Sequence, residues 1–373
     1  MGKKKTVREA NRTGGLDNTL IFSAIGDVFI GGTVRLIGGR TVASDEQLGK
    51  KAFDKVLPYF HNSDFNFCNL EGPLANRGEL QPGRSAALRG YPSMVEVLKK
   101  ARIDFVSLAN NHIMDYGWEG FAETTETLRQ NGIGFSGGGK DIEAARRPAL
   151  VNKNGMTVGL LSYTANVNVP LGFQAAQGKP GLAPVRISPF FSPDHTNKED
   201  LEALQKDIET CLEKVDFLIV SFHWGVSEGG THTIALHQQS IAHHAIDAGA
   251  DLILGHHPHA IQGVEIYRDK PICYSLGHFT FAYFTAKEGF PKETMLFQCR
   301  ISPHRIHEAK FLPAFISKKG QPEILSPDDP KGSEIVVLMK KLCSDLGTKL
   351  VVQKQTGEII FKRAAPSAPT KKI

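Results

Sequence analysis

The sequence has few cysteines and no cysteine motif. Its 373 residues include five, Cys68, Cys211, Cys273, Cys299 and Cys343, an odd number with no CxxC pair among them. This set excludes the disulfide framework of a small secreted domain and a thiolate zinc site. Cys273 and Cys299 lie in apolar, strand-like runs, where buried free thiols are expected.

Long apolar runs are missing as well. A membrane helix needs about 18 or more consecutive apolar residues, and no segment has them; no apolar run precedes Leu20. We therefore expect neither a signal peptide nor a membrane anchor. The cytoplasm is the default location, and the cell envelope stays open as an alternative if a leader has been removed.

Positive charge is scarce in the body of the chain. The net charge is +5, but residues 1–20 carry +3 and residues 361–373 carry +4, so the remainder is near −2. We expect solvated basic tails, the first a mobile segment over residues 1–19, and no nucleic-acid partner. Weak attraction of the tails to an anionic polymer or membrane surface is the alternative.

Two common catalytic motifs are also absent. The sequence has no GxSxG nucleophile elbow and no GxxxxGK[ST] phosphate loop. The glycines at 137–139 are typical of a turn. Serine-hydrolase and P-loop chemistry are therefore poor fits.

Short apolar runs do alternate with amphipathic stretches, which predicts an α/β fold. We expect strands at 20–28, 64–72, 156–164, 216–225, 251–255, 270–281 and 294–302, a strand that runs into a loop at 103–112, and helices at 93–102, 120–132, 199–215 and 237–250. Two long loops, 73–92 and 166–184, are candidate lids or binding elements. Residues 316–373 form an extension with a helix at 333–346, a strand within 351–363 and a disordered tail.

Polar side chains follow the predicted strands. The set that lies at the carboxyl ends of apolar runs is Asp27, Glu71, Asn110, Asn111, His112, His223, His256, His257, His259 and His278. One such residue is usually a turn or a helix cap. Because ligands bind at this edge of an open α/β sheet, so many together predict a site.

The residue types in this set indicate a metal site without sulfur. Six candidate ligands offer carboxylate, amide or imidazole atoms: Asp27, Glu71, Asn111, His223, His257 and His259. This mixture suits Mn, Fe or Zn. Six ligands are too many for one tetrahedral ion, so we predict two divalent ions that share a carboxylate and hold a hydroxide between them.

The three histidines in LILGHHPHAIQ (252–262) differ in their predicted roles. Alternation along an extended segment would send His257 and His259 to one side and His256 to the other. We therefore predict that His257 and His259 are ligands, and that His256 is an outer or packing residue.

Six motifs resemble, in order, those of the CapA family, the poly-gamma-glutamate capsule-synthesis branch of the calcineurin-like metallophosphoesterase superfamily. They are GDVFIGG (26–32), NLEGPL (69–74), SLANNHIMDYG (107–117), SFHWG (221–225), GHHPHAIQ (255–262) and YSLGHF (274–279). The resemblance covers residues 20–315. It implies a layered α/β/β/α sandwich of metallophosphoesterase type with mixed sheets.

The resemblance also implies roles for the residues. Asp27 and His259 would bind the first metal, and Asn111, His223 and His257 the second, with Glu71 in place of the bridging aspartate of the superfamily. His112 would be the catalytic residue that stabilises the transferring group or protonates the leaving oxygen. Asn110 would be an extra ligand or support the ligands from behind.

The sequence departs from the superfamily pattern in the first motif. Asp27-Val28-Phe29 stands where the superfamily has D-x-H, so the first metal lacks an imidazole. The CapA family shares this departure, but its SLGNF is here SLGHF. His278 either replaces the missing imidazole in part or forms a hydrogen bond near the site.

Two functions remain open. The first is a metal-dependent hydrolase that cleaves a phosphoester or an amide in a small phosphorylated or gamma-glutamyl-type substrate. The second is a non-hydrolytic role in making or handling an acidic polymer such as poly-gamma-glutamate. Arg77, Arg84 and Arg89 in the first long loop suit phosphate and carboxylate equally, so they do not decide. The sequence leaves the oligomeric state open.

Overall fold

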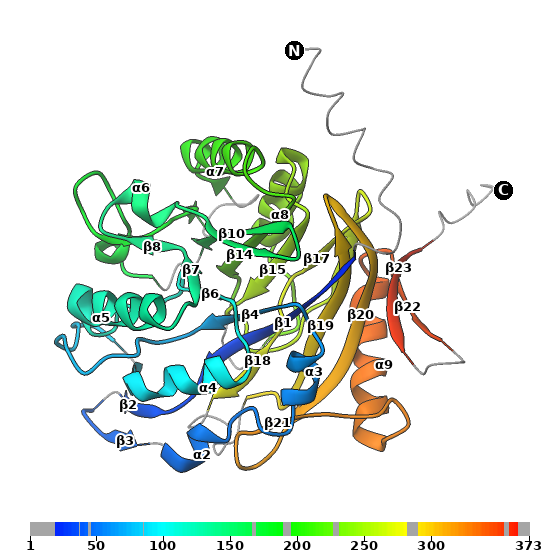
Figure 1. The fold of residues 1–373 in the computed structure, drawn as a ribbon, viewed down its shortest axis with the longest axis horizontal. Coiled ribbons are helices and arrows are strands. Elements are labelled where there is room, and N and C mark those ends of the chain that lie inside the picture. Colours follow the sequence, from blue (N-terminus) through cyan, green and yellow to red (C-terminus); the bar gives the residue numbers. More distant parts are fainter. Residues whose placement is uncertain are drawn as a thin grey trace.

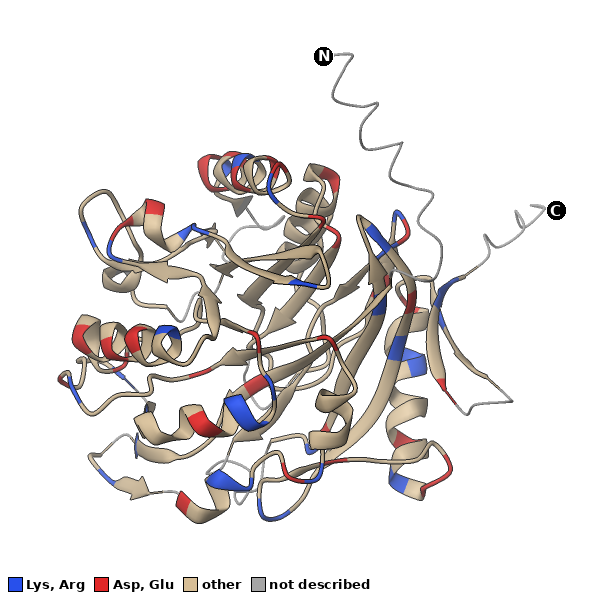
Figure 2. Ribbon diagram, in the orientation of Figure 1, with Lys and Arg blue, Asp and Glu red and all other residues tan. Residues whose placement is uncertain are grey.

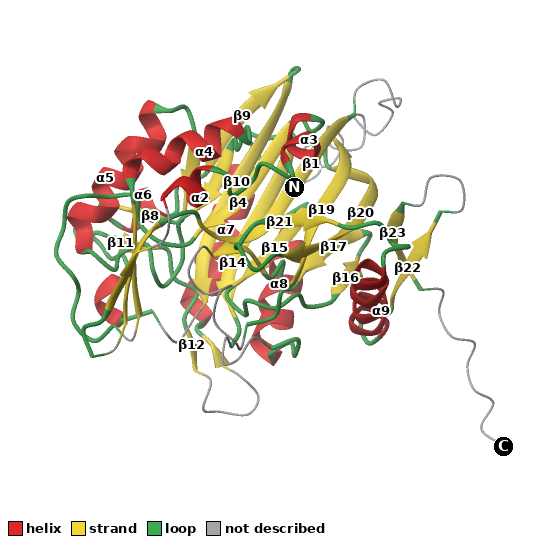
Figure 3. Ribbon diagram, turned by 90° about the horizontal axis from the view of Figure 1, so that it is seen from below, coloured by secondary structure: helices red, strands yellow, loops and turns green. Residues whose placement is uncertain are grey.

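Two β-sheets face each other at the centre of the computed structural model, with helices over both outer faces (Figures 1 and 3). The structure describes residues 19–36, 38–43, 46–84, 86–165, 169–188, 195–226, 231–281, 290–353 and 358–364. The expected α/β/β/α sandwich with mixed sheets is confirmed. The predicted mobile and disordered tails lie outside the described residues, except Thr19 and Ala364 at their inner ends.

The first sheet has ten strands and contains the first strand of the chain at its centre. Its order is β22 (Thr348–Val352), β23 (Ile359–Arg363), β20 (Arg305–Ile316), β19 (Glu293–Ser302), β1 (Leu20–Phe29), β4 (Phe65–Leu70), β6 (Phe105–Ser107) and β7 (Gly134–Ser136), while β18 (His278–Phe281) pairs with β1 and β21 (Pro322–Ile324) with β20. Strands β1, β4, β6 and β7 run parallel, so their carboxyl ends share one edge.

The second sheet has six strands, of which the central four are parallel. Its order is β16 (Val264–Tyr267), β17 (Lys270–Cys273), β15 (Leu252–His256), β14 (Phe217–Trp224), β10 (Met156–Ala165) and β9 (Ala149–Lys153). Smaller sheets join β3 (Thr41–Ala43), β2 (Gly32–Leu36) and β5 (Ala86–Gly90); β8 (Gly138–Gly139) and β11 (Gly181–Leu182); and β12 (Ile187–Ser188) and β13 (His195–Thr196).

Apolar residues fill three layers. Phe22 and Phe67 of the first sheet meet Leu160 and Leu254 of the second in the central layer. The two outer layers lie between the sheets and the helices.

The helices fall into two groups, one beside each sheet. Beside the first sheet lie α2 (Glu46–Lys50), α3 (Leu57–His61), α4 (Val95–Lys100) and α5 (Gly117–Gln130), and beside the second lie α6 (Ile142–Ala145), α7 (Lys198–Cys211) and α8 (Leu236–Ala248). Helix α9 (Pro330–Ser344) follows near the C-terminus, and η3 (Pro92–Met94) and η4 (Leu171–Phe173) are 3-10 turns.

Helical periodicity explains how the covering helices lie. In α7 the buried residues Leu204, Ile208 and Cys211 recur every three or four positions, as an amphipathic helix requires. The rest of α7, like that of α5, carries charges of both signs, so neither helix presents a surface of one charge (Figure 2).

The C-terminal extension packs against the sandwich. Helix α9 places Ile335, Val336 and Met339 in the central apolar layer beside Phe311. The segment predicted to contain one strand forms the hairpin β22–β23, which continues the first sheet beyond β20 (Figure 1). Whether residues 20–315 act as a domain of their own stays a prediction.

One strand prediction was wrong. The run 270–281 is not a single strand, because β17 ends at Cys273 in the second sheet and β18 begins at His278 in the first. The chain crosses between the sheets through Gly277, whose φ of 73° is one that glycine adopts without strain. Both long loops also contain short elements, β5 in 73–92 and η4 and β11 in 166–184.

Candidate metal centre

The first sheet contributes the carboxylates of the site. Asp27 lies near the end of β1, where the pairing with β4 shifts register after Ala24 and the pairing with β18 shifts after Asp27. Such irregularities re-aim a side chain next to a functional site. The segment before β18 comes so close that a Cβ at position 26 would lie 1.8 Å from the Gly277 carbonyl oxygen, which explains why residue 26 is a glycine.

Glu71 follows β4 directly and is completely buried. Both of its carboxylate oxygens lack a hydrogen-bond partner among the described residues. Its neighbour Asn69, which the sequence reasoning did not single out, donates from Nδ2 to Asp27 Oδ1 at 2.8 Å. Asn69 therefore fixes the orientation of the Asp27 carboxylate.

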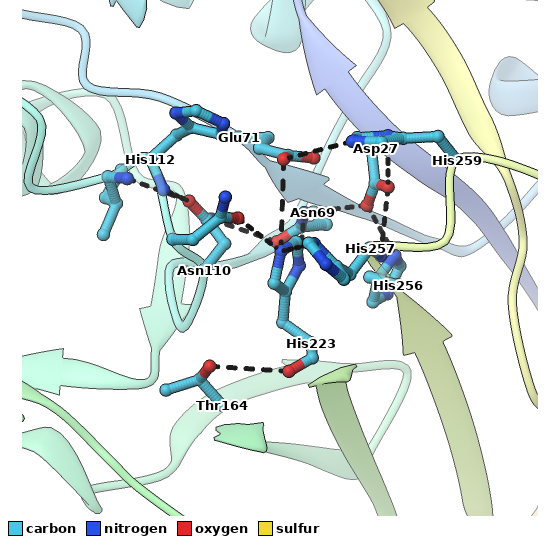
Figure 4. A network of polar contacts seen from close by, with 12 residues as sticks. Asp27, Asn69, Glu71, Asn110, His112, Thr164, His223, His256, His257 and His259 are labelled. Carbon is cyan, nitrogen blue, oxygen red and sulfur yellow. Dashed lines mark hydrogen bonds and ion pairs between the residues drawn. The ribbon is translucent and has the colours of Figure 1, made fainter. Parts of the chain in front are cut away.

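The second sheet contributes the imidazoles. His223 lies near the end of β14, and its Nε2 is 3.1 Å from His257 Nδ1 and 2.7 Å from Asn111 Oδ1. The backbone N–H of His257 donates to Asp27 Oδ2 at 3.2 Å. His259 Nδ1 lies 3.3 Å from the same oxygen, so the two sheets meet at Asp27 (Figure 4).

The expected alternation, with His257 and His259 on one side and His256 on the other, was wrong because residues 256–259 are not extended. Strand β15 ends at His256, and His257 and His259 have φ values of 94° and 57°. Left-handed backbone at two non-glycine residues is costly and clusters at functional sites. His256 is fully buried, and its Nδ1 lies 3.2 Å from Asp27 Oδ1, so it supports the carboxylate from behind.

Two groups of ligand-type atoms share Glu71. Within each group the atoms lie within 4.8 Å of one another: Glu71, His257 and His259 form one, and Asp27, Glu71 and His223 the other. Glu71 lies between the Asp27–His259 pair and His112 (Figure 4). A buried carboxylate without a hydrogen-bond donor, facing two sets of nitrogen and oxygen atoms, fits a pair of divalent cations.

Burial and neighbouring charges adjust the ionisation of these groups. Burial opposes ionisation of Asp27, but His256 and His259 outweigh it and hold the pKa of Asp27 well below its usual range. Burial, followed by the charges of Asp27 and Asp115, raises the pKa of Glu71 well above its usual range.

Two of the buried histidines, His223 and His257, are shifted toward the neutral form. Burial, followed by the nearby His257, lowers the pKa of His223 well below its usual value. Burial and His259 lower the pKa of His257 to about 3. Neutral imidazoles keep a nitrogen lone pair, which a metal ion needs.

The segment after β6 is held by its own asparagine. Asn110 donates to the Leu70 carbonyl at 2.8 Å and to Asn69 Oδ1 at 3.2 Å, and its Oδ1 accepts from the N–H of Ile113 at 2.9 Å. These bonds fix the loop that presents Asn111 and His112. Asn110 therefore organises the loop that carries two candidate site residues, and a direct ligand role for it stays a prediction.

His112 pairs with a residue that the sequence reasoning missed. Its Nδ1 lies 2.7 Å from Asp115 Oδ2, and the Asp115 side chain is fully buried. The N–H of Leu88 also donates to Asp115 Oδ2 at 2.7 Å. The signal was present in the motif NNHIMDYG, where an aspartate three residues after a histidine can reach its ring.

His278 lies at the start of β18, beside Asp27 in the parallel register. Its Nδ1 lies 2.8 Å from the His259 carbonyl oxygen, so it supports the left-handed backbone there. His278 belongs to neither ligand group among the described residues. Its Nε2 is buried without a hydrogen-bond partner in that part of the chain, and a direct ligand role stays a prediction.

The three loop arginines lie in different surroundings. The Arg77 side chain is 74% exposed beside Glu123. Arg89 stacks on Tyr116, with its guanidinium carbon 3.4 Å from the ring centre, and donates to the Gly78 carbonyl. Of the three, Arg84 is the one that contacts Asn111, His112 and Asp115.

A two-sheet sandwich with carboxylates and imidazoles gathered at its strand ends defines the metallophosphoesterase-like class of folds. A family model described as bacterial capsule synthesis protein PGA_cap matches residues 21–283. The chain therefore belongs to the PGA_cap family of capsule-synthesis proteins, and the resemblance inferred from its motifs is confirmed.

Curated relatives carry matching names. The PGA biosynthesis protein CapA of Bacillus subtilis is 29% identical over 267 residues, which cover 71% of this chain and 64% of the relative. A probable polyglutamine synthesis accessory protein of Mycobacterium tuberculosis is 32% identical over 228 residues, covering 60% and 57%. The chain thus spans about three fifths of the length of these relatives.

A hypothetical protein from Thermus thermophilus is a solved structure similar to this chain. It is 14% identical with a TM-score of 0.45, and the match covers 79% of this chain and 98% of that one.

Within the described part of the chain, none of the helices has the length and apolar character needed to span a membrane.

Proposed function

We propose that this protein is a metal-dependent hydrolase that cleaves a phosphoester or an amide bond. The observation that carries the proposal is Glu71, a buried carboxylate shared by two ligand groups. His112, whose Nδ1 contacts Asp115, lies on one side of it (Figure 4).

The residues divide the work between binding and proton transfer. Asp27, Glu71, Asn111, His223, His257 and His259 would hold two divalent ions, Mn, Fe or Zn. When bound, the ions activate a water molecule as the nucleophile and stabilise the charge that develops on the transferring group. Asp115 orients His112 through Nδ1, so His112 can donate a proton from Nε2 to the leaving oxygen or nitrogen.

The proposed substrate is small and carries a phosphate or a gamma-glutamyl-type amide. Hydrolysis of either group passes through a transition state with extra negative charge on oxygen, which two cations would stabilise in both cases.

Hydrolysis by metal-loaded protein tests the proposal. We expect Mn²⁺-loaded protein to hydrolyse members of a panel of phosphoesters and gamma-glutamyl amides, and His112→Ala to lower kcat about 10²- to 10⁴-fold. His61→Ala, a change at an exposed histidine of α3, is the matched control and should retain full activity. Wild-type protein that is no more active than His112→Ala across the panel would contradict the proposal.

A second candidate is a non-hydrolytic role in handling an acidic polymer, supported by the names of the relatives and by the exposure of Arg77. Binding of poly-gamma-glutamate that survives chelation of metal but is lost in Arg77→Glu would favour it. Binding that disappears with the metal would instead favour the hydrolase.

A further inference from the structure

Arg84 is an almost buried cation beside the candidate metal centre. Only 8% of its side chain is exposed, yet it belongs to a loop, where arginines are usually solvated. A buried guanidinium is tolerated when charged and polar partners satisfy it. The identity of these partners therefore indicates what the residue does.

The partners of Arg84 flank His112 on both sides in the sequence. Its Nε lies 2.6 Å from Asp115 Oδ1, and its Nη2 donates to the backbone carbonyl of Asn111. The same Nη2 lies 3.4 Å from His112 Nδ1. Arg84 thus holds the residue before His112 and the carboxylate that orients its ring.

The two oxygens of Asp115 are divided between these groups. Oδ2 faces His112 Nδ1 and accepts from the Leu88 N–H, while Oδ1 faces Arg84. Oδ2 is held by hydrogen bonds and Oδ1 by the charge of the Arg84 guanidinium, so the ion pair opposes rotation of the carboxylate away from the imidazole. Asp115 Oδ2 lies closer to His112 Nδ1, at 2.7 Å, than Arg84 Nη2 does, at 3.4 Å, so Arg84 acts on the imidazole ring chiefly through Asp115.

Arg84 also joins the two long loops. It comes from the loop at 73–92, and its guanidinium carbon lies 5.8 Å from the ring centre of Phe173, in the loop at 166–184. The contact places the guanidinium between an aromatic ring and the catalytic segment, which fixes its position further.

We propose that Arg84 is a positioning residue for proton donation by His112, holding Asp115 and the Asn111 carbonyl so that the imidazole faces the leaving group. This inference rests on the proposed hydrolase function. It differs from a substrate-binding role for Arg84, because each of the three contacts is to the protein's own catalytic segment.

Arg89 is the matched control within the same loop. It stacks on Tyr116 and holds the Gly78 carbonyl, so Arg89→Ala loosens the loop without removing a contact to His112 or Asp115. An effect shared by Arg84→Ala and Arg89→Ala therefore reports loop structure alone.

The test compares a phosphoester with a poor leaving group, an alkyl phosphate, with an aryl phosphate, which needs little protonation. We expect Arg84→Ala to lower kcat for the alkyl phosphate about 10- to 100-fold, with KM nearly unchanged and the aryl phosphate much less affected. Arg84→Lys should recover part of the loss, and metal content measured by mass spectrometry should match wild type. Arg89→Ala should leave the ratio between the two substrates unchanged.

Several outcomes would overturn the inference. A raised KM with unchanged kcat would make Arg84 a substrate-binding residue, and equal losses for both substrates would make it purely structural. If wild-type protein hydrolyses nothing, the hydrolase proposal fails by itself. Histidine ¹⁵N NMR then decides on Arg84: we expect the Nδ1-protonated form of His112 to fall in Arg84→Ala, and an unchanged tautomer ratio would refute the positioning role.

Discussion

At the scale of the residue, Glu71 is the most unusual feature of the molecule. A fully buried carboxylate without a hydrogen-bond donor among the described residues is costly, because the Nε2 atoms of His259 and His223 lie 3.8 and 4.0 Å from it, beyond hydrogen-bond distance. Asp27 differs, since Asn69 and three histidine contacts surround it. A cation bound beside Glu71 would therefore supply the positive charge that this carboxylate lacks.

Divalent metal should accordingly stabilise the folded protein. We expect saturating Mn²⁺ or Zn²⁺ to stabilise it by about 3 to 4 kcal/mol, the gain for a ligand at 100 to 1,000 times its Kd. Calorimetry of chelated and reloaded protein measures the shift in Tm. Glu71→Gln should remove most of the shift while its metal-free form is at least as stable as wild type.

Glu123→Gln, at a carboxylate outside both ligand groups, serves as the control and should retain the full metal-induced shift. Equal shifts in wild type and Glu71→Gln would show that Glu71 does not bind the metal.

The residues of the site were predictable from sequence to different degrees. Asp27, Glu71 and His223 follow apolar strands, so strand periodicity was enough to bring them to one edge. Asp115 was missed because its role depends on a turn between Asn110 and Asp115 that no periodicity describes. Arg84 was identified as a binding candidate, but its near burial depends on Phe173, 89 positions away in the sequence.

At the scale of the element, strand ends are connected at the edge opposite the site. Asp251, just before β15, accepts from the Leu218 N–H at 2.9 Å and from Lys270 Nζ at 2.8 Å. His304, in the turn between β19 and β20, lies 3.5 Å from the same carboxylate. Asp251 therefore ties a hairpin of the first sheet to the start of the second.

Removing this charge should weaken the contact between the sheets. Burial opposes ionisation of Asp251, but His304 and Lys270 hold its pKa below the usual range. A lowered carboxyl pKa stabilises the fold above the unfolded value of about 3.9, and this stability is lost as pH falls through the folded pKa. Asp251→Asn should cost about 3 to 5 kcal/mol at pH 7, measured by urea unfolding, and the difference from wild type should shrink below about pH 4.

Asp247→Asn, which affects an exposed pair with Arg268, is the control and should cost less than about 1 kcal/mol. A cost for Asp251→Asn that stays constant with pH would contradict the ionic explanation.

Elements were predicted well where a strand or helix has its own period, as in β1, β10, α7 and α8. The split of 270–281 into β17 and β18 was not, because both halves are apolar and only tertiary pairing assigns them to different sheets. The small sheet β3–β2–β5 was missed for the same reason: β2 and β5 are 50 residues apart and stabilise each other only when paired.

At the scale of the whole molecule, the C-terminal extension completes the core. Met339 is fully buried in the layer between the sheets, although it lies far beyond residue 283, where the family match ends. Residues 21–283 alone would leave part of this apolar layer open to solvent.

Met339→Ala should therefore destabilise the entire sandwich. We expect a loss of about 2 to 5 kcal/mol and a single unfolding transition, followed by fluorescence in urea. Val337→Ala, on the 63% exposed position of the same helix, should change stability by less than about 0.5 kcal/mol. Two separate transitions, of which Met339→Ala moves only one, would instead make residues 316–373 an independent unit.

The meeting of the two sheets at Asp27 and Glu71 has a mechanical consequence. The carboxylates come from one sheet and the imidazoles from the other, so each bound cation would act as a cross-link across the mouth of the sandwich. The chain itself crosses between the sheets nearby, at Gly277. Any force that separates the two sheets would therefore first lengthen the distances between the cations and their protein ligands. An ion that binds with shorter distances would make the whole fold more rigid.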